Sequence, residues 1–249
     1  MDIIIYSDKR SRVHRLDPRA RIIAAVLSSM AISICHEPRA LAFALIAGVL
    51  AVSVAQVPIA AILQRLVPLN GLLLLLSLSL LFFTPGETIF TIGALEATME
   101  GFRQAVITGL KANAIVLLLA ALLGTIELVD LGHAMSRLKV PPVLTHIFLF
   151  TIRYMSLMLA EFERLSRAAQ LRGFRPGANR HTLRTTGYLV GMLLVRSYAR
   201  GERILNAMRL RGYTGTLAFD GELAYARRDA VFALLALAAL GALLGLESK

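Results

Sequence analysis

A chain of 249 residues that is 57% hydrophobic and 17% charged, with a mean hydropathy of +0.67, is too apolar for an ordinary soluble domain. Lys and Arg nonetheless outnumber Asp and Glu by 27 to 16, which gives a net charge of +11. An apolar and basic chain indicates a membrane protein with arginine-rich cytoplasmic surfaces. The long apolar runs leave no soluble body to carry a basic nucleic-acid-binding face, so we expect no nucleic-acid partner.

Five apolar segments approach the roughly 20 residues that a membrane-spanning helix needs. They follow a basic segment, residues 1–21, and are Ile22–Cys35, Ala40–Val57, Val67–Phe83, Ala105–Ile126 and Ala230–Leu246. We therefore predict an all-α integral membrane protein with about five transmembrane helices, four within residues 22–126 and the last within 230–249. Lys111 interrupts the fourth segment, either as a side chain that snorkels to the interface or as a buried charge paired with Glu127 or a partner subunit.

The distribution of charge predicts how these spans are oriented. Region 127–229 carries sixteen Lys and Arg against eight Asp and Glu, and Arg65 lies between the second and third spans. Three acidic residues follow the third span. The positive-inside rule then places the N-terminus and region 127–229 in the cytoplasm. The basic residues before the first span are Lys9, Arg10, Arg12, Arg15, Arg19 and Arg21, and the acidic ones after the third are Glu87, Glu96 and Glu100.

Region 127–229 holds two further apolar runs, Val143–Ala160 and Thr186–Ala199. The first has Arg153 near its middle, where a charge in the bilayer is costly, and the second is short. We predict two long cytoplasmic helices, Pro142–Arg172 and Asn179–Arg211, each apolar first and amphipathic toward its basic end. A shorter helix, Val129–Leu138, precedes them. A sixth span at 143–160 remains an alternative.

Each long helix ends in nearly the same phrase. "ERLSRAAQLRGF" covers 163–174, "ERILNAMRLRGY" covers 202–213, and six of the twelve positions are identical. Residues at i, i+3 and i+4 share one helix face, and the final Gly of each phrase is a typical C-cap. Capping alone explains one Arg-Gly end, whereas two copies favour sockets on two similar partner subunits. The face and cap of the first copy are Ala168, Leu171, Arg172 and Gly173, and those of the second are Ala207, Leu210, Arg211 and Gly212.

The phrases "AAQLRGF" and "AMRLRGY" resemble the two Ala-Arg-Gly motifs of the transmembrane T component of energy-coupling factor (ECF) transporters, in the cobalt/nickel branch. "HRLDPRARI", which includes Asp17, Pro18 and Arg19, is similar to that family's N-terminal signature. Arg21 stands where the family commonly has Lys. Gln170 departs from Arg209 of the second copy, which makes the two sockets unequal. Asp17 and Pro18 also suit an ordinary helix start, so either a cap or an inter-subunit contact explains them.

The resemblance implies a non-catalytic coupling subunit. In this role it transmits ATP-driven motion from two cytoplasmic ABC-type ATPases to a substrate-binding membrane subunit, with or without a small accessory membrane subunit. Arg172 and Arg211 would each engage a groove on an ATPase, with Ala168 and Ala207 packed beside them. The implied location is a bacterial or archaeal cell membrane. The implied cargo is cobalt or nickel, and import of a vitamin is the alternative.

Several motifs are absent from the sequence. Their absence agrees with a coupling subunit that leaves ATP hydrolysis and substrate binding to its partners. There is no GxxxxGK[ST] phosphate-binding loop, so ATP and Mg²⁺ are expected on the partner ATPases and no cofactor on this chain. No His pair has metal-ligand spacing, and the single cysteine, Cys35, has no CxxC partner, so no metal site is predicted. Two rival functions remain: an integral-membrane enzyme acting on lipid phosphates, and a self-sufficient carrier or channel.

Overall fold

The computed structural model describes residues 16–92, 95–213 and 227–247. The signature residue His14 and the basic residues up to Arg15 lie outside this part of the chain, as do positions 214–226. The chain divides into two compact units, Met1–Asp130 with Glu222–Lys249, and Leu131–Gly221. We describe each unit by itself.

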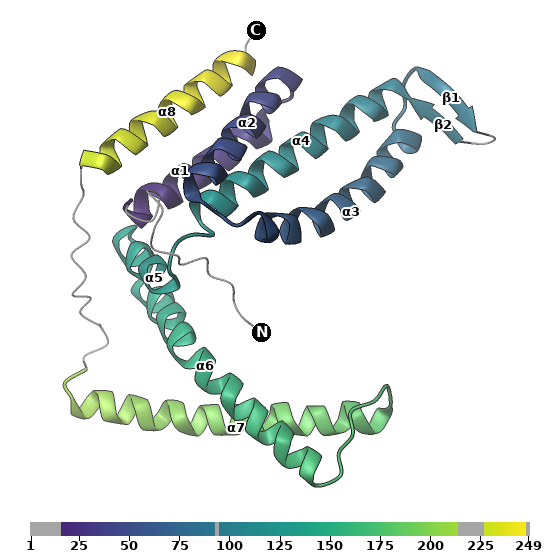
Figure 1. The fold of residues 1–249 in the computed structure, drawn as a ribbon. Coiled ribbons are helices and arrows are strands. Elements are labelled where there is room, and N and C mark those ends of the chain that lie inside the picture. The colour runs from purple at the N-terminus through teal and green to yellow at the C-terminus, as the bar shows by residue number, and fades with distance from the viewer. Residues whose placement is uncertain (1–15, 93–94, 214–226, 248–249) are drawn as a thin grey trace. The chain divides into compact units, whose positions relative to one another are not determined.

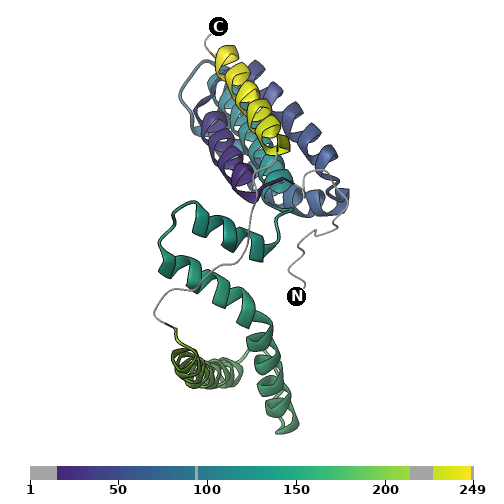
Figure 2. The same ribbon diagram turned by 90° about the vertical axis from the view of Figure 1, so that its left-hand side faces the viewer.

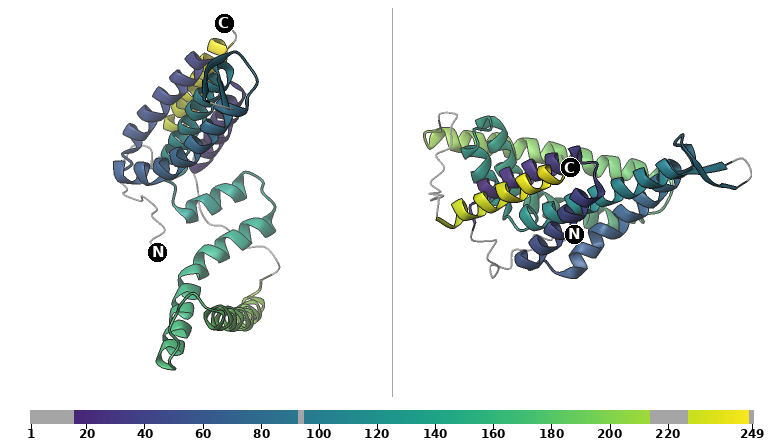
Figure 3. Two further views of the ribbon diagram at one scale, coloured as in Figure 1. Left: turned by 90° about the vertical axis from the view of Figure 1, so that its right-hand side faces the viewer. Right: turned by 90° about the horizontal axis from the view of Figure 1, so that it is seen from above.

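The first unit is a helical bundle. Its helices are α1 (Pro18–Ile34), α2 (Pro38–Ala55), α3 (Ile59–Phe83), α4 (Met99–Leu122) and α8 (Arg227–Glu247). Prolines start α1 and α2, where the missing N–H costs nothing. α4 packs against α1, α2 and α3, while α8 lies beside α1 and α2 (Figures 1, 2 and 3). The carboxyl-terminal helix therefore closes onto the helices that begin the chain.

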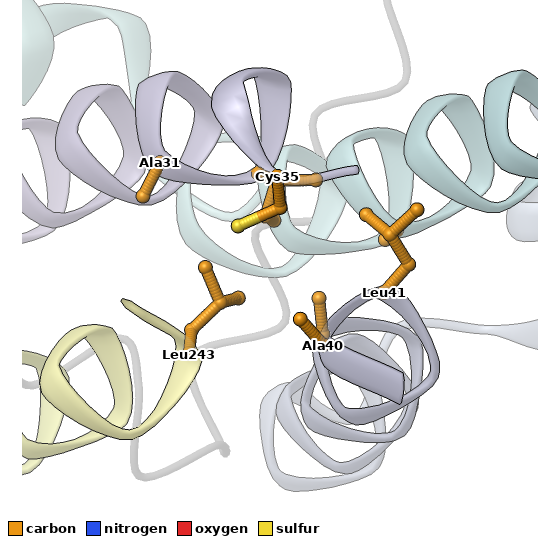
Figure 4. Close-up of a cluster of buried hydrophobic side chains, with 8 residues drawn as sticks. Ala31, Cys35, Ala40, Leu41 and Leu243 are labelled. Carbon is orange, nitrogen blue, oxygen red and sulfur yellow. The ribbon is translucent and has the colours of Figure 1, made fainter. Parts of the chain in front are cut away.

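Small residues let the helices of this bundle approach closely. A Cβ on Gly48 of α2 would lie 3.1 Å from Cβ of Leu117 on α4, so only glycine fits without a shift there. Bilayer lipid is as apolar as leucine, and close packing rather than burial from water must hold such helices together. One buried cluster joins α1, α2, α4 and α8 (Figure 4); it contains Ala31, Ile32, Cys35, Ala40, Leu41, Ala44, Ala114 and Leu243.

Polar side chains add specific contacts to this apolar packing. Asn70 of α3 and Asn113 of α4 exchange two amide hydrogen bonds, each 3.0 Å long. Lys111 Nζ donates to the carbonyl oxygen of Ser33, 2.8 Å away, in the last turn of α1. The Lys111 ammonium therefore caps a helix carbonyl of its own unit.

A short antiparallel hairpin connects α3 to α4, and the sequence analysis did not predict it. Its strands are β1 (Thr88–Ile92) and β2 (Leu95–Thr98), paired from Thr88↔Thr98 to Ile92↔Leu95. Thr98 ends the hairpin and caps α4, because its hydroxyl accepts the Gly101 N–H at 3.2 Å. The fold class remains all-α, with this one small sheet among the described residues.

The second unit contains most of α5 (Leu128–Arg137), together with α6 (Pro142–Leu171) and α7 (Arg180–Leu210). α6 and α7 cross one another (Figure 1). Glu161 of α6 is buried at this crossing and binds Arg196 of α7, with Arg164 Nη1 a further 3.7 Å contact. This ion pair fixes the point at which the two long helices touch.

Five helices of the described residues are long and apolar enough to cross a membrane: α2, α3, α4, α6 and α8. The predicted first span, Ile22–Cys35, lies almost wholly in α1, whose 17 residues reach about 26 Å, slightly less than the roughly 30 Å bilayer core. The run 143–160, kept above as an alternative span, lies within α6, which is 30 residues long. Length and composition therefore allow α6 to span a membrane and do not decide between the two interpretations of this run.

Candidate functional site

The first copy of the duplicated phrase closes α6 with a left-handed glycine. Arg172 follows the last helical residue with φ −88° and ψ 12°, and Gly173 has φ +91°. The N–H of Gly173 donates to the Gln170 carbonyl at 2.9 Å, and that of Phe174 to the Ala169 carbonyl at 3.1 Å. These bonds satisfy carbonyls that the helix end leaves open, and they turn the chain sharply after Arg172.

The second copy closes α7 in the same way. Arg211 has φ −93° and ψ 14°, and Gly212 has φ +83°. The N–H of Gly212 donates to the Arg209 carbonyl at 3.1 Å, and that of Tyr213 to the Met208 carbonyl at 3.0 Å. The two phrases are therefore similar in backbone geometry as well as in amino-acid sequence.

The two helix tips also expose the same side chains. Leu171 and Leu210 are each 90% exposed, and Arg172 and Arg211 beside them are exposed too. Ala168 and Ala207, one turn earlier, are likewise exposed, so the predicted i, i+3, i+4 face is open on both helices. A leucine held clear of the protein next to an arginine is a small amphipathic contact surface, which we call a coupling tip.

A groove runs along the α6–α7 pair beside each coupling tip. The first has a volume of about 390 Å³ and includes Ile204, Met208 and Tyr213 of the second phrase. The other, of about 530 Å³, is lined in part by the corresponding residues of the first phrase, Leu165, Ala169 and Phe174, and by Arg172. The larger groove also contains His181 and Arg196, whereas the smaller one contains Arg200, so the two grooves differ in their basic side chains.

The N-terminal signature residues belong to the other unit and form a helix cap. The Asp17 carboxylate accepts the Arg19 N–H at 2.9 Å, and Pro18 is the first residue of α1. The backbone N–H of Asp17 in turn donates to the carboxylate of Asp229, 2.7 Å away and 212 positions along the chain. The signature thus contacts its own chain, as the ordinary helix-start interpretation predicts.

Arg21 is named in the sequence analysis, but its partner, Thr125, is not predicted there. Arg21 is 1% exposed, and its guanidinium donates to the Thr125 hydroxyl at the end of α4. Burial lowers the pKa of Arg21 to about 10, against an opposing effect of Asp130, so Arg21 stays protonated at neutral pH. The sequence gives one hint of this contact, which is that Arg21 lies three residues after Pro18 and therefore in the first turn of a helix.

Residues 35–37 connect α1 to α2. The N–H groups of His36 and Glu37 donate to the Glu247 carboxylate at 2.9 and 3.0 Å. Within residues 16–92, 95–213 and 227–247, no three His, Cys, Asp or Glu side chains gather as a metal site would require. The two bonds to Glu247 fasten the end of α8 to the α1–α2 connection.

A family model described as CbiQ, cobalt transport protein, matches residues 9–220 of this chain. The energy-coupling factor transporter transmembrane protein EcfT of Heliobacterium modesticaldum is 28% identical over 215 residues, which cover 82% of this chain and 81% of that protein. EcfT of Bacillus subtilis is 26% identical over 221 residues, covering 84% and 83%. EcfT of Acidaminococcus fermentans is 28% identical over 250 residues, covering 94% and 91%.

These relatives are transporter transmembrane proteins and not enzymes, which confirms the non-catalytic assignment. They also confirm the resemblance to the T component of ECF transporters, and the matched model carries the name of the cobalt branch. Together with the apolar helices, they establish a multi-pass membrane protein. The chain therefore belongs to the CbiQ family of cobalt transport proteins.

Proposed function

We propose that this chain is the coupling subunit of an ECF-type uptake transporter and that each coupling tip binds one of two cytoplasmic ABC-type ATPases. The observation that carries this proposal is the matched exposure of Leu171 and Leu210 on helix ends of matched geometry. A monomer gains nothing from holding two leucines 90% exposed beside two arginines. Two similar sockets on two similar ATPases would cover both.

The side chains of each tip have distinct parts in this binding. The leucine supplies an apolar plug, the alanine leaves room for a close approach, and the arginine offers a forked donor to an acidic or carbonyl partner. The left-handed glycine turns the chain away, so the arginine stands at the very end of the helix. ATP and Mg²⁺ belong to the ATPases, and this chain binds no cofactor.

Transport then follows from the movement of two levers. ATP-driven closure of the ATPases would draw the coupling tips together, and α6 and α7 would pivot where Glu161 binds Arg196. A substrate-binding membrane subunit, with or without a small accessory subunit, would respond to that motion. Coupling of this kind moves packed helices as rigid bodies and needs no chemistry on this chain.

The proposed orientation places the N-terminus and both coupling tips in the cytoplasm of a bacterial or archaeal cell. The sixteen basic residues of region 127–229 support it. The proposed cargo is a cobalt or nickel ion, supported by the description of the family. Import of a vitamin is the alternative, and the membrane subunit that co-purifies would decide between them.

A pull-down from host membranes tests the tips. The full chain, tagged at its C-terminus, is compared with Arg172→Ala/Arg211→Ala. Loss of one buried charge-assisted contact costs about 2–5 kcal/mol, and losing one of two linked contacts also forfeits about 10²–10⁴ in avidity. We expect ATPases with the wild type and none with the double variant, while either single variant already retains far less.

The matched control is Arg175→Ala/Arg180→Ala, which removes two exposed arginines outside the phrases, one in the α6–α7 loop and one at the start of α7. This control has the same net charge as Arg172→Ala/Arg211→Ala, and we expect it to retain the ATPases. Equal retention by both double variants would contradict the proposal. Equal loss from both would show a diffuse electrostatic attachment and would contradict it as well.

A further inference from the structure

Two carboxylates hold α8 to the start and to the end of α1. At one end, Asp229 accepts the backbone N–H of Asp17 at 2.7 Å. At the other, Glu247 accepts the N–H groups of His36 and Glu37 at 2.9 and 3.0 Å. Both ends of α8 are thus fixed at α1, while α8 also packs against α2.

An apolar groove of about 940 Å³ lies between the first turns of α8 and the second half of α2. Its walls include Ala51 and Val54 of α2 and Val231 and Leu235 of α8, over Leu122 of α4. Three of these wall residues, Val54, Val231 and Leu235, are more than half exposed, so the groove opens outward along the bundle. Its volume falls within the roughly 300–1,000 Å³ typical of small-molecule sites.

The groove lies on helices that cross a membrane, and its chemistry is that of a lipid site. Among the described residues, the one charged side chain that lines it is Arg228, which is exposed in the first turn of α8. Asp229 beside it is only 2% exposed and already accepts the Asp17 N–H. An apolar slot with a guanidinium at its membrane-surface end complements an acyl chain that carries a negatively charged headgroup.

We propose that this groove binds an anionic phospholipid, with one acyl chain between α2 and α8 and the headgroup phosphate at Arg228. The lipid completes the packing of α8, whose two ends are held by polar contacts and whose first turns leave this space beside α2. Apolar space that faces the bilayer does not hold ordered water, because water needs two or more polar partners. The site is independent of the coupling tips, which lie in the other unit.

The experiment is native mass spectrometry of the purified full chain, with added phosphatidylglycerol or phosphatidylcholine of identical acyl chains. We expect one tightly held lipid per chain and a preference for phosphatidylglycerol. Arg228→Gln should reduce that preference roughly fivefold, the share that one arginine near a membrane surface contributes. Arg65→Gln, an exposed arginine of α3 outside the groove, is the matched control and should leave the preference unchanged.

A second pair of variants tests the slot itself. Ala51→Phe fills the groove and should lower lipid occupancy at least fivefold, whereas Ala42→Phe places the same ring on an exposed position of α2 outside it. Unchanged occupancy in Ala51→Phe would overturn the proposal. So would equal binding of the two lipids by the wild type, or a second protein chain that takes the groove and excludes lipid.

Discussion

At the scale of the residue, each of the two phrases contributes a glycine that no other residue replaces freely. Gly173 and Gly212 have φ of +91° and +83°, and no atom lies within 4 Å of where a Cβ would stand. A side chain there meets backbone strain and no steric clash. The left-handed region costs a bulky L-residue about 1–2 kcal/mol, and asparagine less.

We therefore predict that Gly173→Val/Gly212→Val weakens ATPase retention in the pull-down, because the strained ends no longer hold both arginines in the same place. Gly173→Asn/Gly212→Asn should retain more of the ATPases. Thermal unfolding of the chain in detergent should change little, since both tips are exposed. If the valine variant binds ATPases as well as the wild type does, the left-handed cap is not part of the tip.

Arg21 is a residue of the opposite kind, because it is buried and its contacts lie within one unit. We predict that Arg21→Ala lowers the free energy of unfolding by about 3 kcal/mol or more, since it leaves buried groups without their partner. Arg21→Lys keeps the charge and should recover part of this loss. The control is Arg19→Ala, whose side chain is 25% exposed and should cost far less. Equal unfolding midpoints for Arg21→Ala and Arg19→Ala in detergent would contradict this role.

At the scale of the element, α8 closes the bundle over the single cysteine of the chain. Cys35 is fully buried beside Leu243 of α8 (Figure 4), and the contacts of Glu247 hold the same α1–α2 connection. The thiol therefore reports on whether this end of α8 is docked, because labelling with a maleimide requires the end to open.

We predict that Leu243→Ala raises the labelling rate of Cys35 roughly tenfold, which corresponds to about 1.4 kcal/mol of lost packing. The matched control is the next residue, Leu244→Ala, which is 50% exposed and should leave the rate unchanged. Glu247→Ala should act in the same direction as Leu243→Ala. A wild-type Cys35 that reacts as fast as a free thiol would show that α8 does not cover it.

The sequence predicts the helices of the second unit well, because residues that begin or end helices flank them. Pro141-Pro142 and the two Arg-Gly ends gave α6 as Pro142–Arg172 against the observed Pro142–Leu171. The predicted third span begins at Val67, eight residues after the start of α3, because Arg65 interrupts the apolar run although the helix continues through it. The hairpin is not predicted because its acidic residues favour a loop between two spans.

Some contacts of the candidate site can likewise be predicted from the sequence, and others cannot. The face of each coupling tip follows from helical spacing alone, so the sequence suffices to place Ala168, Leu171 and Arg172 on one face of the helix. The Asp17–Asp229 and Glu161–Arg196 contacts join residues that are distant in sequence, and no local pattern signals such pairs. Lys111 illustrates this limit, because its carbonyl partner, Ser33, carries no sequence signal of its own.

At the scale of the whole molecule, the two units suit different physical tasks. The membrane bundle has buried polar contacts at Arg21 and Asp229, and the Asn70–Asn113 pair joins α3 to α4. The second unit has leucine and arginine directed outward at both helix ends. A fixed membrane anchor and a pair of exposed levers are what a coupling subunit requires.

The most direct test of this account is site-specific cross-linking at the coupling tips. In a Cys35→Ala background, Leu171→Cys and Leu210→Cys each place one thiol at a 90% exposed tip position, and Leu183→Cys, at 76% exposure on α7 outside the phrases, is the control. After labelling of these thiols in intact membranes with a maleimide-benzophenone reagent and illumination, which inserts into nearby C–H bonds, we predict a cross-link from positions 171 and 210 to an ATP-binding-cassette subunit and none from 183. Cross-links of equal yield from all three positions, or to no ATPase from either tip, would contradict it.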